Sequence, residues 1–168
     1  TRKESSAASD VYKRQAIGYD KKLSRAMYKA LQASGMNVQN YGTVFVTLAD
    51  EDKPEGLPLV RRFYEMGFNI EATAGTAAYL KSFGIRTRVR GKISDGSHEI
   101  LDSIRSGYVS YIINTRSIHS SVHAQDGAAI RRCAVENGVT VFTSLDTVRV
   151  LLDVLEETTL AVSTIHAE

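Results

Sequence analysis

The residues best suited to chemistry in this chain are Thr73, Gly75 and Thr76, in the short motif Thr-Ala-Gly-Thr. The motif directly follows the predicted strand 68–72 and precedes a segment with helical periodicity. Two hydroxyls, a backbone without a side chain and the N-terminus of a helix together form a cradle for phosphate. The motif leaves a second interpretation open, in which Thr76 only caps the helix and Gly75 only serves the turn.

A second polar motif, Asn114-Thr115-Arg116, follows the apolar run 109–113. Asn114 could hold a ribose or the edge of a base, and Arg116 could pair with a phosphate. Asparagine and threonine are also common in loops that follow strands, so this motif alone does not establish a site.

Two lysines could reach the same crevice. Lys53 lies in the charged cluster 50–53, which is otherwise typical of solvated surface, and Lys92 follows Gly91, whose turn could direct it at a phosphate. The preceding arginines alternate along an extended segment and are predicted to form a solvated strand edge that discourages unwanted pairing. These arginines are Arg86, Arg88 and Arg90.

Metal binding and covalent catalysis are not expected. His119 and His123 have the i to i+4 spacing of metal ligands only if their serine-rich segment is helical, and no third ligand is evident. The single cysteine, Cys133, lies in the apolar stripe of a predicted helix and is expected in the core. No Ser-His-Asp arrangement, phosphate-binding Walker loop or paired-cysteine motif is present.

The elements that must position these residues alternate between strand and helix. A helix is predicted after Asp20, ending at Gly35, and further helices begin near Pro54, Ala77 and Ile100. This alternation predicts an α/β fold: a three-layer, Rossmann-like domain with a five-stranded, mainly parallel sheet. Ligands bind at the carboxyl ends of such strands, where the polar motifs lie. The predicted strands are 43–49, 68–72, 87–89, 109–114 and 139–142.

Composition narrows the class of protein. A hydrophobic fraction of 43% in 168 residues is enough for a core, and a net charge of +2 does not suggest a nucleic-acid partner. No stretch has the ~20 apolar residues of a membrane span. Residues 1–15 lack the apolar region of a signal peptide and are predicted to be a disordered tail or a cloning remnant. We therefore expect a cytoplasmic protein without a membrane partner.

Several motifs, in order, resemble the methylglyoxal-synthase-like domain that ends carbamoyl-phosphate synthase large subunits. They are residues 68–76 (FNIEATAGT), 91–96 (GKISDG), 111–115 (YIINT) and 128–132 (AAIRR). The resemblance covers residues 42–155, and residues 16–41 resemble the segment that joins the last ATP-grasp half to this domain. It implies a linking helix in 16–41, an allosteric domain over 42–160 and a C-terminal tail over 161–168.

The resemblance implies a regulatory domain with no catalytic centre of its own. Its effector would be a nucleotide monophosphate, uridine or inosine monophosphate (UMP or IMP). The family's phosphate- and nucleotide-binding positions correspond to Lys53, Thr73, Thr76, Lys92 and Asn114; Gly75, Thr115 and Arg116 adjoin them and complete the predicted site.

The resemblance also implies partners and a pathway. The parent enzyme is an ATP-dependent, glutamine-hydrolysing ligase that serves pyrimidine and arginine biosynthesis. The partners of the domain would be the rest of the large subunit and the glutaminase small subunit. The domain itself would need no cofactor, whereas the parent uses ATP with magnesium or manganese.

Two departures and two alternatives accompany the resemblance. Arg116 replaces a second threonine of the bacterial pattern, so the preferred nucleotide is open. Val141 and Phe142 replace a tyrosine–aspartate pair, which argues against ornithine activation.

One alternative is a free-standing methylglyoxal synthase acting on dihydroxyacetone phosphate. That enzyme has a catalytic aspartate where this chain has Ser97, although Asp95 and His123 are near. The other alternative is an interaction module with an empty crevice.

Overall fold

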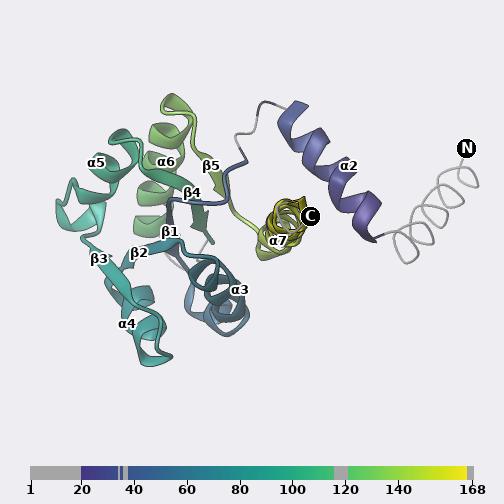
Figure 1. Ribbon diagram of the computed structural model, residues 1–168. Coiled ribbons are helices and arrows are strands. Elements are labelled where there is room, and N and C mark those ends of the chain that lie inside the picture. Colours follow the sequence, from purple (N-terminus) through teal and green to yellow (C-terminus); the bar gives the residue numbers. More distant parts are fainter. Residues whose placement is uncertain (1–19, 34, 36–37, 116–120, 166–168) are drawn as a thin grey trace, which may run out of the picture. The chain divides into compact units, whose positions relative to one another are not determined.

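The computed structural model describes residues 20–33, 35, 38–115 and 121–165 (Figure 1). The chain divides into two compact units, of which one is Gln39–Leu152. The other comprises Thr1–Val38 and Asp153–Glu168 and includes helix α2 (Asp20–Ala33), which begins and ends close to its predicted bounds. The tail predicted over residues 1–15 and the site residue Arg116 lie outside the described residues.

The unit Gln39–Leu152 is built on a five-stranded sheet with the order β3-β2-β1-β4-β5 (Figure 1). All four pairings are parallel, so the predicted α/β sheet is confirmed and is parallel throughout. Val44, Phe45 and Val46 of the central strand are at most 1% exposed, as expected where helices cover both faces of a sheet. The strands are β1 (Thr43–Thr47), β2 (Asn69–Thr73), β3 (Thr87–Arg90), β4 (Val109–Asn114) and β5 (Thr140–Phe142).

Helices cover both faces of the sheet and make three layers (Figure 1). Right-handed crossovers place α3 (Lys53–Glu65) and α4 (Ala74–Ser82) on one face. The chain then crosses back over the sheet, so α5 (Glu99–Arg105) and α6 (Ser121–Glu136) lie on the other face. The last helix, α7 (Leu145–Ile165), follows β5. Two single 3₁₀ turns, η1 (Asp50–Asp52) and η2 (Ile93–Asp95), precede α3 and α5.

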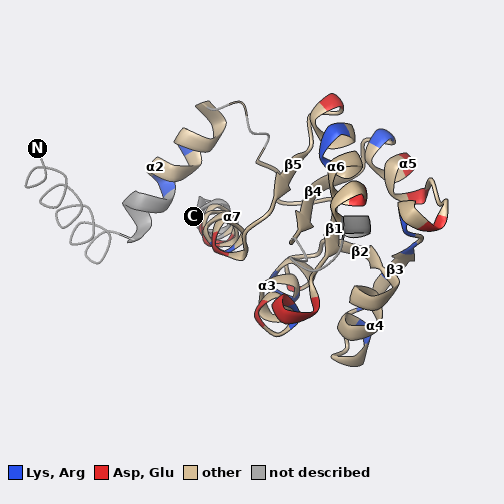
Figure 2. Ribbon diagram, turned by 180° about the vertical axis from the view of Figure 1, so that it is seen from behind, with Lys and Arg blue, Asp and Glu red and all other residues tan. Residues whose placement is uncertain are grey.

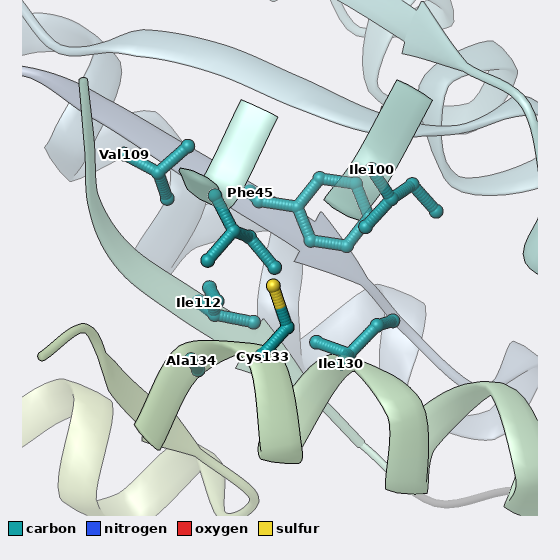
Figure 3. Packing of buried hydrophobic residues seen from close by; sticks show 8 residues of the cluster. Phe45, Ile100, Val109, Ile112, Ile130, Cys133 and Ala134 are labelled. Carbon is teal, nitrogen blue, oxygen red and sulfur yellow. The ribbon is translucent and has the colours of Figure 1, made fainter. Parts of the chain in front are cut away.

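One part of the core lies between the sheet and the helices α5 and α6 (Figure 3). Phe45 of the central strand and Ile112 of β4 pack there against Ile100, Ile130 and the other members of the cluster. Cys133 is 4% exposed within this cluster, which confirms its predicted place in the core. The remaining buried members are Ile104, Val109 and Ala134.

Glycine ends helix α2 close to where the sequence predicts, at Gly35, and Pro54 begins α3 as predicted. Glycines also follow α3 and α5. Gly67 and Gly107 have φ angles of 95° and 85°, a left-handed conformation that costs other residues energy. Pro54 lies in the first turn of α3, where its missing N–H leaves no hydrogen bond unmade. No helix among the described residues is long and apolar enough to cross a lipid bilayer.

Three element boundaries differ from those expected. Helix α4 begins at Ala74 rather than near Ala77, because Gly75 does not adopt a left-handed turn and the strand runs straight into the helix. Helix α6 begins at Ser121, so His123 lies in a helix rather than a loop, whereas His119 is outside the described residues. Helix α7 continues to Ile165, into the segment 161–168 predicted as a tail.

The prediction that Arg90 belongs to a solvated edge is wrong. Its side chain is 19% exposed and its NH2 group lies 2.8 Å from Oε1 of Glu71, whose side chain is 4% exposed. The hydrogen bond that Arg90 donates to Glu71 raises the pKa of Arg90 above its ordinary value, so the guanidinium stays charged. Tyr108 joins the pair: its hydroxyl lies 3.2 Å from Glu71 Oε1 and 2.8 Å from Ser103 Oγ of α5. The cause is the buried carboxylate, which needs a charged partner.

Replacing Arg90 with methionine is expected to destabilise the unit strongly. The substitution leaves the buried Glu71 carboxylate without its partner, which costs roughly 3 kcal/mol in the free energy of unfolding. Arg88→Met is the matched control, because the Arg88 side chain is 71% exposed and 4.0 Å from the same carboxylate. Chemical denaturation measures both variants. Equal stabilities for the two would show that the Glu71–Arg90 pair does not hold this part of the sheet together.

Candidate functional site

A cavity of about 350 Å³ opens at the carboxyl ends of β1, β2 and β4. The chain leaves β1 toward β2 and later returns to β4 on the other side, so this edge is the topological switch point at which α/β sheets bind ligands. Seven of the eight predicted site residues line the cavity, and the eighth, Arg116, is outside the described residues. The seven are Lys53, Thr73, Gly75, Thr76, Lys92, Asn114 and Thr115.

Threonine hydroxyls hold together the three segments that form the floor of the cavity. The backbone N–H of Leu48 donates to Thr76 Oγ1 at 3.1 Å, and the N–H of Ala49 donates to Thr115 Oγ1 at 2.8 Å. Thr76 and Thr115 are 2% and 8% exposed. Each hydroxyl that accepts such a bond keeps its own proton to donate, so it can still bind an acceptor in the cavity.

The N-terminus of α4 faces this floor. Thr73 occupies the N-cap position with extended backbone angles, and its Oγ1 makes no bond to the first turn but lies 3.3 Å from Thr47 Oγ1. The interpretation that Thr76 caps the helix is therefore wrong, since Thr76 lies inside the first turn and its side chain bonds to Leu48. The free N–H groups of this turn give the end of α4 a partial positive charge.

Lys53 brings a full positive charge to the same end of the cavity. Its side chain is 16% exposed and its Nζ lies 2.5 Å from Oδ1 of Asp50. A Cβ atom added at Gly75 would lie 3.7 Å from the Lys53 Nζ, so the ammonium stands beside the first turn of α4. The Asp50 side chain is 91% exposed, and water screens its charge more than that of the lysine. Figure 2 shows acidic residues gathered at the start of α3.

A tight loop after β3 positions Lys92. The N–H of Gly91 donates to Glu99 Oε2 at 2.6 Å, and the N–H groups of Asp95 and Ser97 both donate to the Lys92 carbonyl. A Cβ at Gly91 would lie 2.6 Å from Ser97 Oγ, so only glycine lets the loop close. Lys92 lines the cavity and forms no ion pair with any described residue.

Another part of the cavity wall is formed by β4 and α6. Asn114 is 7% exposed, and its amide has no hydrogen-bond partner among the described residues. A Cβ added at Gly127 would lie 3.1 Å from Asn114 Nδ2 and 3.4 Å from Arg131 NH1, so the glycine leaves room for both groups. Arg131 lines the cavity and was not among the predicted site residues. The motif 128–132 contained it, but nothing in that motif indicates which of two adjacent arginines turns inward.

Asp126 is the second cavity residue that the sequence did not reveal. Its Oδ2 accepts a hydrogen bond of 3.2 Å from the N–H of Ser94, which ties α6 to η2. Figure 2 shows that α6 carries both acidic and basic residues. The cavity thus combines three cations with two carboxylates. An arrangement of this kind can bind an anion at one end and polar groups at the other.

Few of the described side chains that could act as a catalytic base or as a metal ligand line the cavity. Asp95 and Ser97 are not among the residues that line the cavity, and the side chain of His123 lies outside the described part of the structure. Asp50 and Asp126 are the carboxylates in the described cavity wall. Within the described residues, no group of three or more His, Cys, Asp or Glu side chains is placed to hold a metal ion.

A family model places the chain among known proteins. The model of the MGS-like domain matches residues 55–143, which is more than half of the 168 residues. The matched region runs from within α3 to just after β5 and contains the three crossovers from β2 to β5, together with Thr73, Thr76, Lys92 and Asn114 of the cavity. The chain belongs to the MGS-like domain family.

Proposed function

We propose that this chain is the allosteric domain of a carbamoyl-phosphate synthase large subunit and binds a nucleotide monophosphate, UMP or IMP, at the cavity. The observation that carries the proposal is the convergence of seven predicted binding residues on one cavity at the switch point of the sheet. Its volume of about 350 Å³ lies in the range of sites that enclose whole small-molecule ligands. The domain then supplies regulation, and the catalytic centres lie elsewhere in the parent enzyme.

The phosphate belongs at the end of the cavity formed by α4, Lys53 and Lys92. This end combines two lysines, the first-turn N–H groups of α4 and the hydroxyls of Thr73 and Thr76. Helix N-termini and lysines favour a doubly charged anion together, because the partial charge of the helix adds to the full charge of the ammonium groups. Binding there would change the activity of the parent enzyme through different affinities for its states, a coupling of roughly 1–3 kcal/mol.

Gly75 supports the placement of the phosphate. Its φ angle is not left-handed, so the turn itself does not require glycine, and an added Cβ would meet nothing closer than the Lys53 Nζ at 3.7 Å. Alanine would therefore fit the fold and would favour the helix. The missing side chain is best explained by the close approach of a ligand to the backbone of the first turn.

Asp126 favours a second candidate function, methylglyoxal synthase acting on dihydroxyacetone phosphate. Removal of a proton next to a carbonyl needs a base, and Asp126 is a carboxylate in the wall of a phosphate-binding cavity. The position of the synthase's catalytic aspartate is Ser97 here, which has no comparable basicity. The cavity is also much larger than a three-carbon phosphate requires.

Calorimetric titration of the chain with UMP, IMP and dihydroxyacetone phosphate tests the proposal. We expect saturable binding of at least one nucleotide and no methylglyoxal in the dihydroxyacetone phosphate sample. Lys53→Met and Lys92→Met should each weaken nucleotide binding about tenfold or more, because each removes a charged hydrogen-bond donor from the phosphate.

Lys81→Met is the matched control, since Lys81 is an exposed lysine in the last turn of α4 and does not line the cavity. Production of methylglyoxal would replace the regulatory proposal with the enzymatic one. A loss of affinity in Lys81→Met as large as in Lys53→Met would refute the assignment of the phosphate end.

Gly75→Ala should separate stability from binding. We expect the free energy of unfolding to stay the same or to rise by up to about 1 kcal/mol, because alanine favours a helix over glycine. Nucleotide affinity should fall about tenfold, because the added methyl group obstructs a hydrogen-bonded approach to the backbone. Denaturation and calorimetry on the same preparation give both quantities. Unchanged affinity in a stable variant would contradict a phosphate against this turn.

A further inference from the structure

We infer that Glu99 is a positioning residue for the bound phosphate, because it holds Lys92 in place through the backbone of the loop 91–97. The inference rests on the proposed function, since it concerns how that site holds its anion. Residues 91–97, which lie between β3 and α5, are called the lysine loop below. Glu99 is the first residue of α5 and is not among the residues that line the cavity.

A short hydrogen bond joins Glu99 to the start of the lysine loop. The N–H of Gly91 donates to Glu99 Oε2 at 2.6 Å, and Gly91 directly precedes Lys92. Because the acceptor is a carboxylate, this bond belongs to a class that is shorter and stronger than bonds between neutral groups. In return, the backbone N–H of Glu99 donates to Ser97 Oγ at 3.3 Å. Glu99 therefore bonds to both ends of the lysine loop.

The contacts inside the loop fix the backbone of Lys92. The Lys92 carbonyl accepts from the N–H groups of Asp95 at 3.1 Å and of Ser97 at 3.2 Å. An added Cβ at Gly91 would lie 2.6 Å from Ser97 Oγ, so the two ends of the loop are in contact. With the backbone held on both sides, a ligand has to order the side chain of Lys92 and not the whole loop. That reduces the entropic cost of binding and raises the affinity.

Three carboxylates hold this part of the chain, and Glu99 differs from the other two. Glu71 pairs with Arg90 at the end of β3, where the buried pair contributes to stability. Asp126 accepts from the N–H of Ser94, but it lines the cavity and can meet a ligand directly. Glu99 is exposed and makes its bond from outside the cavity wall. Its effect on the position of a ligand must therefore pass through the lysine loop.

The charge of Glu99 has the wrong sign for an anion site. A carboxylate near Lys92 repels a phosphate through space, so removal of its charge alone would strengthen the binding of an anion. The bond to Gly91 has the opposite effect, since it holds the lysine in place. Lys92 forms no ion pair with any described residue, so its charge remains available to a ligand. The two influences of Glu99 differ in sign, and variants can separate them.

Variants at this one position of the full chain test the inference. Affinities for UMP, IMP and inorganic phosphate are measured by calorimetry. Glu99→Gln retains an oxygen that can accept from Gly91 and loses the charge, so affinity should stay the same or rise. Glu99→Met has neither, and affinity should fall about fivefold, the factor expected for one lost hydrogen bond. Glu99→Asp keeps the charge on a side chain that is one methylene shorter, and its affinity should fall as well.

A double-mutant cycle with Lys92→Met shows whether Glu99 acts through the lysine. In the Lys92→Met background, Glu99→Met should lower affinity by no more than about twofold, because the side chain that it positions is already gone. A general disturbance of the domain would instead lower affinity by the same factor in both backgrounds. Hydrogen exchange of the Gly91 amide, followed by NMR, reports the bond itself and should be faster in Glu99→Met than in Glu99→Gln.

Asp102→Leu is the matched control. Asp102 is an acidic residue of the same helix, its side chain is 69% exposed, and it does not line the cavity. Its ion pair lies within the helix, with Arg105 at 3.8 Å. The variant removes one negative charge from α5, as Glu99→Met does, and should keep the affinity within about twofold, because a highly exposed charge is screened. Circular dichroism compares the folding of all variants, and Glu99→Asp carries the test if Glu99→Met does not fold.

The outcomes separate this inference from the proposed function. A higher affinity in both Glu99→Gln and Glu99→Met would show that Glu99 acts by its charge alone and would overturn the inference. A loss in Glu99→Gln as large as in Glu99→Met, or an equal loss with and without Lys92, would overturn it too. If the unaltered chain binds inorganic phosphate but no nucleotide, the proposed function fails, and the phosphate affinities of the same variants decide the inference. If the chain binds neither, both fail.

Discussion

Two amide groups just after the central strand govern the architecture of the cavity. The N–H groups of Leu48 and Ala49 are buried at the point where β1 has left the sheet, and an unsatisfied buried N–H costs about 1–3 kcal/mol. Thr76 from α4 and Thr115 from the end of β4 supply the acceptors. Each bond fixes a different neighbouring segment against β1, so the floor of the cavity is set by the backbone's own requirement for hydrogen bonds. Since a hydroxyl can accept and donate at once, the threonines that hold the fold together also remain available to a ligand.

The charged side chains are unevenly distributed around this floor. Lys53 and Lys92 flank the N-terminus of α4, and the carboxylate nearest to Lys53 belongs to the highly exposed Asp50. Arg131 and Asp126 of α6 also line the cavity, and Asp126 is only partly exposed and accepts a hydrogen bond from the N–H of Ser94. Solvent weakens the negative charge of Asp50 more than that of Asp126. The positive charge of Lys53 beside the N-terminus of α4 therefore favours an anion at that part of the cavity.

The sequence predicted the parts of the structure that depend on local patterns, and it failed where side chains from distant segments meet. Alternating apolar runs and glycines predicted five strands and the ends of the helices, because each depends on a few neighbouring residues. Thr73, Lys92 and Asn114 could be assigned to the cavity because the carboxyl ends of parallel strands always meet at one edge. Arg90 could not be told apart from Arg88 by pattern. Its role depends on Glu71, a charged residue between Ile70 and Ala72 of β2, and that residue was the signal for a buried pair. Arg131 and Asp126 were missed because their inward direction depends on the rotation of α6 about its axis.

Membership of the MGS-like family does not by itself decide between regulation and catalysis, because one fold can carry both. Catalysis, unlike regulation, requires a carboxylate in the cavity that can act as a base. A base that removes a proton from carbon must reach the carbon next to the carbonyl, close to the phosphate of a triose. Asp126 comes from α6, and its Oδ2 is engaged by the backbone N–H of Ser94 in η2, two residues after Lys92. Ser97, which the resemblance aligns with the synthase's aspartate, is packed against Gly91 so closely that it serves the closure of the loop that holds Lys92. Ser97 does not line the cavity, so this position contributes to the packing of the loop and offers no base to a ligand in the cavity.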